Sequence, residues 1–244
     1  MKKEKITNRS TAYIYQDLGS IETFVYKIET PKKVFIIDTL CGSLSMEPII
    51  SDLSRVREKK IIIINTHFHW DHVWGNSAFN GEIISHCKCR AYLEKYWEKQ
   101  LEEEKKYLCG RAEKKLPTIT FNDYLGFPEE GIELFYSPGH TADSISIYDH
   151  ADNILYVGDN LEKPLIYVED DDLETYIKTL EQYKKYRPWL IMAGHSIRLK
   201  IDNVQETIDY LKKLKAGEEL VFNTEYEQTV HENNRKVISK KTSK

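Results

Sequence analysis

Short apolar runs with strand spacing occupy the first forty residues of the chain. Residues 12–18, 23–29 and 34–38 are rich in Tyr, Val, Ile and Phe, and the polar residues 30–33 separate the last two runs. This pattern predicts an antiparallel start to a sheet. Residues 61–64 are four consecutive isoleucines, so both faces of a strand built from them would be apolar. We therefore predict a buried central strand at 61–64.

Helical spacing appears between these strands and again further along the chain. Ile49, Leu53 and Val56 mark an amphipathic helix within residues 46–58, and a helix between two strands predicts a parallel crossover. Further helices are expected at 87–107, 170–186 and 204–214, and further strands at 82–85, 119–121, 132–136, 144–148, 154–157 and 189–193. This alternation indicates an α/β protein.

The C-terminal residues are polar and lack a comparable apolar pattern. We assign residues 1–222 to one domain and expect residues 223–244 to form a polar, disordered tail. The first residues lack the apolar stretch of a signal peptide, and no segment has the roughly 20 apolar residues of a membrane span. These features predict a cytoplasmic protein that does not bind membranes.

Composition and charge restrict the kinds of molecule that the protein is expected to bind. The net charge is −4, so no general basic field favours nucleic acid. Cys87 and Cys89 form a C-x-C pair, but no second pair completes a four-cysteine zinc site, and we expect all four cysteines to be free thiols. The expected partner is a small-molecule substrate, and a homo-oligomer is compatible with the sequence.

Metal-binding side chains follow the isoleucine strand directly. His67, His69, Asp71 and His72 lie within six residues, and these histidines are three of the eight in the chain. A strand end that delivers three imidazoles and a carboxylate to one place predicts a metal site.

Three later strands end in further candidate ligands. His140, Asp159 and His195 each follow a predicted strand, and each comes directly after a glycine, which lets the backbone turn sharply and approach a site closely. The set then contains five histidines and two carboxylates. One zinc ion takes about four ligands, so seven ligands fit two divalent ions that share a carboxylate.

The motif at residues 67–72, H-x-H-x-D-H, resembles that of the metallo-β-lactamase superfamily. His140, Asp159 and His195 follow in the order and approximate spacing of that superfamily, and the resemblance extends from about residue 13 to 214. It implies a four-layer αββα sandwich, in which two mixed β-sheets are flanked by helices and the metal site lies at one edge. Carried over residue by residue, it implies a first ion on His67, His69 and His140, a second ion on Asp71, His72 and His195, and Asp159 as the bridge.

The resemblance also implies a reaction. Two divalent ions, with zinc expected ahead of iron or manganese, would activate a bridging hydroxide that attacks an ester-type bond of a small molecule, such as a thioester or lactone. Asp71 would accept a proton, because a monodentate carboxylate keeps one oxygen free.

Relatives within the superfamily suggest which substrates to exclude. The true β-lactamases lack a carboxylate at the position of Asp159, which disfavours antibiotic hydrolysis. The nuclease branch has an additional domain and a basic face, and the flavodiiron branch has a flavin domain; neither feature is visible here. Hydroxyacylglutathione hydrolase and acyl-homoserine-lactone lactonase resemble the site most closely. The glutathione enzyme carries a longer, basic C-terminal region, so the substrate stays open.

Other activities stay open as well. The alternatives are a phosphodiesterase, a mononuclear iron oxidoreductase of the persulfide-dioxygenase type, and, ranked last, a metal-binding protein without catalysis. Metal content separates the iron enzyme from the hydrolase, because the iron enzyme would contain a single iron and consume oxygen.

Several residues near the motifs have two interpretations. Asp38 ends a strand, and either occupies a turn or accepts a hydrogen bond from a ligand histidine. Asp143 stands where the family often has glycine, and we favour a turn cap over a charge near the site. Tyr167 could reach the cleft, but a core position is favoured. The remaining histidines, His86, His150 and His231, are interpreted as surface or core residues.

Overall fold

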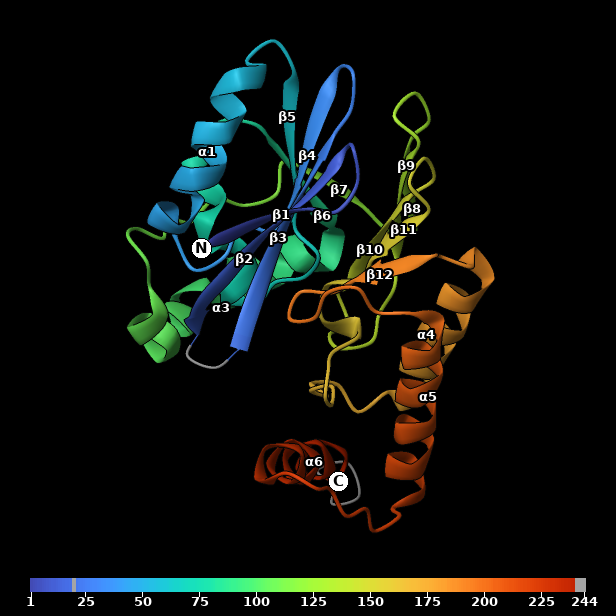
Figure 1. The fold of residues 1–244 in the computed structure, drawn as a ribbon. Helices are drawn as coiled ribbons and strands as arrows, with labels where there is room; N and C mark the ends of the chain where they lie inside the picture. The colour runs from blue at the N-terminus through green and yellow to red at the C-terminus, as the bar shows by residue number, and fades with distance from the viewer. Residues whose placement is uncertain (19–20, 240–244) are drawn as a thin grey trace.

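Two stacked β-sheets form the centre of the molecule in a computed structural model (Figure 1), which describes residues 1–18 and 21–239. The larger sheet has seven strands in the order β1-β2-β3-β4-β5-β6-β7, and the smaller has five in the order β12-β11-β10-β9-β8. The strands of the larger sheet are β1 (Lys2–Lys5), β2 (Ser10–Leu18), β3 (Ile21–Glu29), β4 (Lys33–Ile37), β5 (Lys60–Ile64), β6 (Glu82–His86) and β7 (Ile119–Phe121). Those of the smaller sheet are β8 (Tyr124–Phe127), β9 (Ile132–Tyr136), β10 (Ile145–Asp149), β11 (Ile154–Tyr156) and β12 (Leu190–Met192).

The larger sheet is mixed, as the sequence pattern predicts. Strands β1 to β4 pair antiparallel, and β4, β5, β6 and β7 pair parallel, with Ile62 of β5 between Phe35 and Glu82. In the smaller sheet only β11 and β12 are parallel. The strands β1 and β8 were not predicted from the sequence.

The α-helices of the described residues surround the two sheets. They are α1 (Glu47–Leu53), α2 (Trp70–Val73), α3 (Cys87–Glu104), α4 (Leu173–Tyr186), α5 (Ile201–Ala216) and α6 (Glu225–Ser239). In Figure 1, α1 and α3 lie beside the larger sheet, and α4 and α5 lie beside the smaller one. This arrangement is the αββα sandwich, which confirms the predicted fold class. No helix among the described residues is long and apolar enough to cross a bilayer.

The central strand β5 shows how the layers are joined. Ile62 and Ile64 point between the sheets and share a core with Ile147 and Tyr156 of the smaller sheet. Ile63 points the other way, into a cluster that includes Ile49 and Leu53 of α1. Alternating side chains of one strand therefore fill two separate layers, and β5 is buried on both faces as predicted.

The C-terminal residues correct one expectation. We expected residues 223–244 to be disordered, but residues 225–239 form α6, in which Val230, His231 and Asn234 are buried. Two of these three buried side chains are polar, and Val237 and Ile238 are only partly buried against the core, so the apolar pattern of this helix is weak in the sequence. Residues 240–244 of the expected tail lie outside the described residues.

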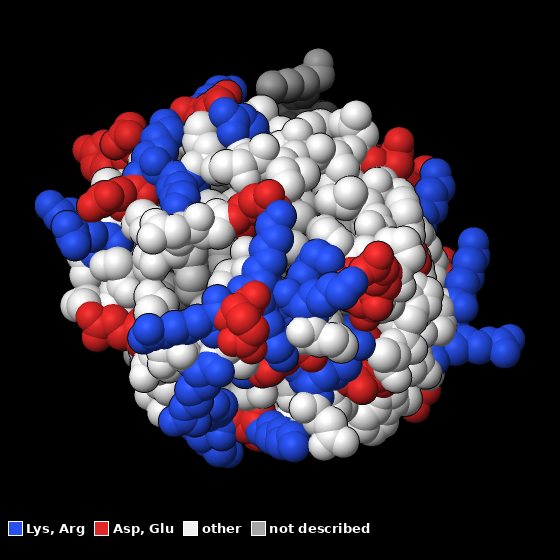
Figure 2. Space-filling model, turned by 90° about the horizontal axis from the view of Figure 1, so that it is seen from above, with Lys and Arg blue, Asp and Glu red and all other residues white. Residues whose placement is uncertain are grey.

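The charged side chains are mixed in sign on the face seen from above. Figure 2 shows Lys and Arg interspersed with Asp and Glu there, in keeping with the net charge of −4.

Candidate metal centre

The candidate ligands lie where strands of both sheets end at one edge of the sandwich. His67, His69, Asp71 and His72 follow β5, and the last two lie in α2. His140 follows β9, Asp159 lies in the 3₁₀ turn Gly158–Asn160 after β11, and His195 follows β12.

Backbone hydrogen bonds between the two sheets hold this edge together. The N–H of Ile145, at the start of β10, donates to the carbonyl of Thr66 at 2.9 Å. The N–H of Phe24 in β3 donates to the carbonyl of Gly194 at 2.9 Å. Each bond links one sheet to a residue directly before a candidate ligand in the other, so the packing of the sheets fixes the distance between the ligands.

All seven candidate ligands come together in two adjoining groups. His67, His69, His140 and Asp159 offer ligand atoms within 4.8 Å of one another, and so do Asp71, His72 and His195. We call these the first set and the second set. They divide the ligands as the resemblance implies, and Asp159, the expected bridge, falls within the first set.

The Oδ2 atom of Asp159 lies between the two sets. It is 3.6 Å from Nε2 of His67 and 3.8 Å from Nε2 of His140. Towards the second set it is 3.2 Å from Nε2 of His72 and 3.3 Å from Nε2 of His195. This oxygen is therefore placed to contact ions in both sets.

The first set has the chemistry and spacing of a divalent metal site. Nδ1 of His69 is 3.1 Å from Nε2 of His67 and 3.1 Å from Nε2 of His140. Metal–nitrogen bonds of about 2.0–2.1 Å in a tetrahedral zinc site separate the ligand atoms by about 3.3 Å. Nε2 of His72 and Oδ1 of Asp159 are also buried without a hydrogen-bond partner in the described structure. A cation satisfies such converging nitrogen and oxygen atoms, so the residues fit divalent metal ions.

Hydrogen bonds on the outer side of the rings orient four of the histidines. Nδ1 of His140 lies 2.9 Å from the carbonyl oxygen of Tyr167, and Nδ1 of His195 lies 3.1 Å from that of Glu22. Nδ1 of His67 lies 3.0 Å from the hydroxyl of Thr66. A proton held on Nδ1 leaves the Nε2 lone pair free for an ion.

Asp38 orients the fourth histidine. Its Oδ2 lies 2.9 Å from Nδ1 of His72, and its two oxygens accept from the backbone N–H and the hydroxyl of Thr66, both at 2.8 Å. Of the two interpretations of Asp38, the structure supports the acceptor that holds a ligand histidine.

The electrostatics of the metal-free centre differ between the two sets. Burial lowers the pKa of His69 to about 3 and that of His67 well below its ordinary value. Burial also disfavours charge on His72 and His195, but the carboxylate of Asp159, with that of Asp71, raises both pKa values well above 6.5. Without metal, the rings of His67 and His69 are therefore neutral, and those of His72 and His195 are charged.

Gly194 permits the close approach of β12 to the centre. A Cβ atom at this position would lie 2.2 Å from Oδ1 of Asp159 and 2.7 Å from Cε1 of His72. No side chain fits there, which explains why a glycine precedes His195.

The other residues singled out in the sequence lie outside the two sets. Asp143 is fully buried, and burial raises its pKa to about 7. Its carboxyl lies beside the side chains of Thr141 and Cys89, and the cap of the turn stays a prediction. As expected for structural histidines, His86 accepts from the N–H of Lys88 at the start of α3, His150 contacts Glu133, and His231 contacts Tyr210. All four cysteines are free thiols, as predicted.

A cavity opens onto the centre. Its volume is about 280 Å³, near the lower end for small-molecule pockets. Its described lining comprises Ile21, His69, Trp70, Asp71, Tyr107, His140, Asp159, Glu162, Tyr167, Glu169 and His195. Tyr167 lines the cavity and also packs against the hydrophobic cluster of the smaller sheet, so both of its interpretations hold in part. Sequence reasoning did not single out Glu162, Glu169 or Tyr107, because no periodicity indicates which side chains outside the regular strands and helices face a cavity.

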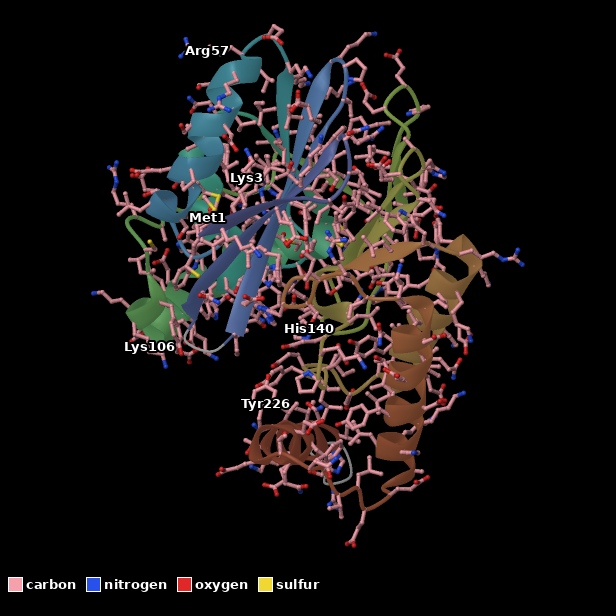
Figure 3. The ribbon with its side chains drawn as sticks, viewed as in Figure 1. Met1, Lys3, Arg57, Lys106, His140 and Tyr226 are labelled. Carbon is pink, nitrogen blue, oxygen red and sulfur yellow. The ribbon has the colours of Figure 1, made fainter. Side chains whose placement is uncertain are left out.

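Helix α6 lies beside this cavity. Figure 3 labels His140 at the edge of the sandwich and Tyr226 on α6. The rings of Tyr226 and Tyr167 are 6.5 Å apart, and Tyr167 contacts His140 through its carbonyl oxygen.

Comparisons with known proteins agree with this fold and centre. The family model described as Metallo-beta-lactamase superfamily matches residues 19–195. A Beta-lactamase-like protein 2 homolog of Caenorhabditis elegans is 26% identical over 229 residues, which are 89% of this chain and 72% of the relative. A Hydroxyacylglutathione hydrolase of Thermosynechococcus vestitus is 26% identical over 115 residues, which are 47% of this chain and 40% of that protein.

Solved structures share the fold at low identity. A metallo-beta-lactamase from Pontibacter korlensis aligns with a TM-score of 0.68 and 16% identity over 86% of this chain and 98% of its own. A metallo-beta-lactamase from Hirschia baltica aligns with a TM-score of 0.67 and 16% identity over 86% and 96%. With the family match over most of its length and a candidate metal site at the expected edge, the chain belongs to the metallo-β-lactamase superfamily and to its hydrolases.

Proposed function

We propose that this protein is a binuclear metallohydrolase that cleaves an ester-type bond, such as a thioester or lactone, in a small molecule. The observation that carries the proposal is the position of Asp159, whose Oδ2 lies within 3.2 to 3.8 Å of imidazole nitrogens from both sets. An oxygen in that position suits two ions better than one. The relative named hydroxyacylglutathione hydrolase and the small volume of the cavity also favour this reaction class.

The first set would hold one ion through His67, His69 and His140, and the second set would hold the other through Asp71, His72 and His195. When bound, two such ions polarise the substrate and acidify a water molecule. Zinc suits the histidine-rich sets, and iron and manganese share the same ligand types.

Asp71 is placed to carry a proton during the reaction. Its Oδ2 lies 3.2 Å from Nε2 of His195, and the side chain lines the cavity. If Oδ2 holds the ion of the second set, Oδ1 can take the proton of the attacking water and return it to the leaving group.

The replacement Asp71→Asn tests this role. We expect the variant to lose about 10²- to 10⁴-fold in kcat, because a carboxamide cannot accept the proton. The matched control is Glu103→Gln, an exposed carboxylate in a groove beside the cavity, which should leave kcat unchanged. An Asp71→Asn protein with both ions and full activity would exclude the role.

Metal analysis joined to a substrate panel tests the whole proposal. We expect two ions per chain and turnover on thioesters or lactones, with little on phosphodiesters. One iron per chain with oxygen uptake would instead indicate the persulfide-dioxygenase type of enzyme.

A further inference from the structure

Glu162 lines the cavity and has no partner in the described structure. The residue is only 8% exposed, and no described residue forms a hydrogen bond or ion pair with its carboxyl group. The neighbouring Lys163 contacts Glu206. A carboxyl group that lines a cavity in a largely buried position, with no partner from the described residues, is available to a group supplied from outside the chain.

The charged residues that line the cavity indicate that the group supplied from outside the chain is positively charged. The described lining contains four carboxylates, Asp71, Asp159, Glu162 and Glu169, and no lysine or arginine. Asp71 and Asp159 belong to the metal sets. Glu162 and Glu169 lie outside both sets, and the described lining holds no lysine or arginine that could pair with either of them.

Aromatic rings complete the walls. Trp70 and Tyr107 stack with their centroids 5.0 Å apart and an interplanar angle of 7°, and Tyr167 lies in the same lining. Aromatic faces attract cations, most strongly where water is excluded. Carboxylates and aromatic rings in the lining of one small cavity are typical of a site for an ammonium or guanidinium group.

We propose that the substrate carries a cationic group beside its scissile bond, and that Glu162 is the residue that recognises it. This inference rests on the proposed hydrolase function and assigns a substrate class to it. The charge balance of the cavity then selects against substrates that carry a carboxylate or phosphate at the same place.

Burial of Glu162 makes its carboxyl group less acidic. It raises the pKa of the carboxyl group to about 8 despite the opposing influence of His195. A cation at this position favours the carboxylate and returns the pKa towards its ordinary range.

Three thiols of similar size and different charge test the proposal without any need for turnover. They are thiocholine, its neutral analogue 3,3-dimethylbutane-1-thiol, and 3-mercaptopropanoate. Each offers a sulfur for the metal centre and a tail for the cavity, and calorimetry on the metal-loaded protein measures its affinity. We expect thiocholine to bind about tenfold more tightly than the neutral thiol, and 3-mercaptopropanoate to bind most weakly.

Variants at position 162 test whether Glu162 causes the preference for thiocholine over the neutral thiol. In Glu162→Gln the preference for thiocholine should fall to within about twofold of the neutral thiol, whereas Glu162→Asp, which keeps the charge, should retain part of it. The matched control is Glu133→Gln, a mostly buried glutamate on β9 outside the cavity lining, which should leave the order unchanged. Elemental analysis of each variant checks that the ions are still bound.

The outcome also separates this inference from the proposed function. Equal or tighter binding of 3-mercaptopropanoate, or an unchanged preference in Glu162→Gln, would overturn the inference. The thioacetate esters of the same thiols test the reaction itself. If none is cleaved while the binding order holds, thioester hydrolysis is wrong and the cation site stands.

Discussion

Asp38 contributes a carboxylate that holds a histidine and not an ion. It contacts Nδ1 of His72 and both the N–H and the hydroxyl of Thr66, the residue directly before the first ligand histidine. A single side chain thus fixes the ring of one ligand and the start of the loop that carries the others.

The replacement Asp38→Asn removes this charge with little change in shape. We expect the second ion to bind about 10- to 100-fold more weakly, because the His72 ring loses the carboxylate that fixes its tautomer and raises its basicity. Competition with a chromogenic chelator measures the affinity.

A matched control separates this effect from general destabilisation. Asp149 is also fully buried and contacts Arg9 at 3.1 Å, but it lies at the end of β10 away from both sets. Asp149→Asn should lower the free energy of unfolding and leave the metal affinity unchanged. Equal metal affinity in Asp38→Asn and Asp149→Asn would exclude the role of Asp38.

Gly194 sets the space between β12 and the bridging carboxylate. In Gly194→Ala the new methyl group would lie 2.2 Å from Oδ1 of Asp159, so the carboxylate must move out of place. We expect the variant to fold and to hold fewer ions per chain by elemental analysis. In Gly217→Ala the Cβ meets nothing within 4 Å, although the φ of 71° is strained. That control should lose about 1 kcal/mol of stability and keep its full metal content.

At the scale of elements, the centre depends on strand ends from both sheets. The end of β5 supplies four of the seven candidate ligands, and β9, β11 and β12 each supply one from the smaller sheet. Each element alone would present isolated histidines or a carboxylate. The two sets form only because the sheets stack with these ends at the same edge.

The unequal charges of the two sets predict a pH dependence. In the metal-free protein the raised pKa values of His72 and His195 mean that these rings are protonated at neutral pH. That protonation stabilises the metal-free fold fully below about pH 6.5 and less as the pH rises through the raised values. Ions entering the second set must displace these protons, so their affinity should rise with pH.

The first set should behave differently, because the pKa values of His67 and His69 are lowered and protons compete there only in acid. We therefore expect the second ion to leave first when the holoprotein is dialysed from pH 8 towards pH 5. Elemental analysis at each step measures the content. Parallel loss of both ions would contradict the assignment.

The same elements show what could be predicted from the sequence. The isoleucine run of β5 and the glycine–ligand pairs after β9, β11 and β12 carry local signals, so the candidate ligands were predicted from the residues themselves. The αββα sandwich was predicted from the resemblance of the motif to the superfamily. Asp38 could not be assigned, because its partner His72 is 34 residues away. Glu162 reaches the cavity from a loop and Tyr107 from the 3₁₀ turn Lys105–Tyr107 after α3, and no periodicity indicates how such segments pack.

At the scale of the whole molecule, the C-terminal helix connects to the metal centre through the loop that carries Tyr167. The side-chain amide of Asn234 in α6 donates to the carbonyl of Ile166 at 2.8 Å, and its oxygen accepts from the N–H of Val168 at 2.9 Å. These two bonds fix the residues on either side of Tyr167. The carbonyl of Tyr167 in turn accepts from Nδ1 of His140 in the first set.

The replacement Asn234→Ala breaks this connection at its most distant point. The carbonyl of Ile166 and the N–H of Val168 would stay buried without these partners, which costs about 1–3 kcal/mol. We expect a lower free energy of unfolding in urea and weaker binding of the first ion, because the loop no longer holds the carbonyl that orients His140. Asn233→Ala is the matched control, since Asn233 is the preceding residue on the exposed face of α6. If the two variants matched in stability and metal affinity, α6 would be a surface addition; a difference confined to Asn234 would make it part of the support of the metal centre.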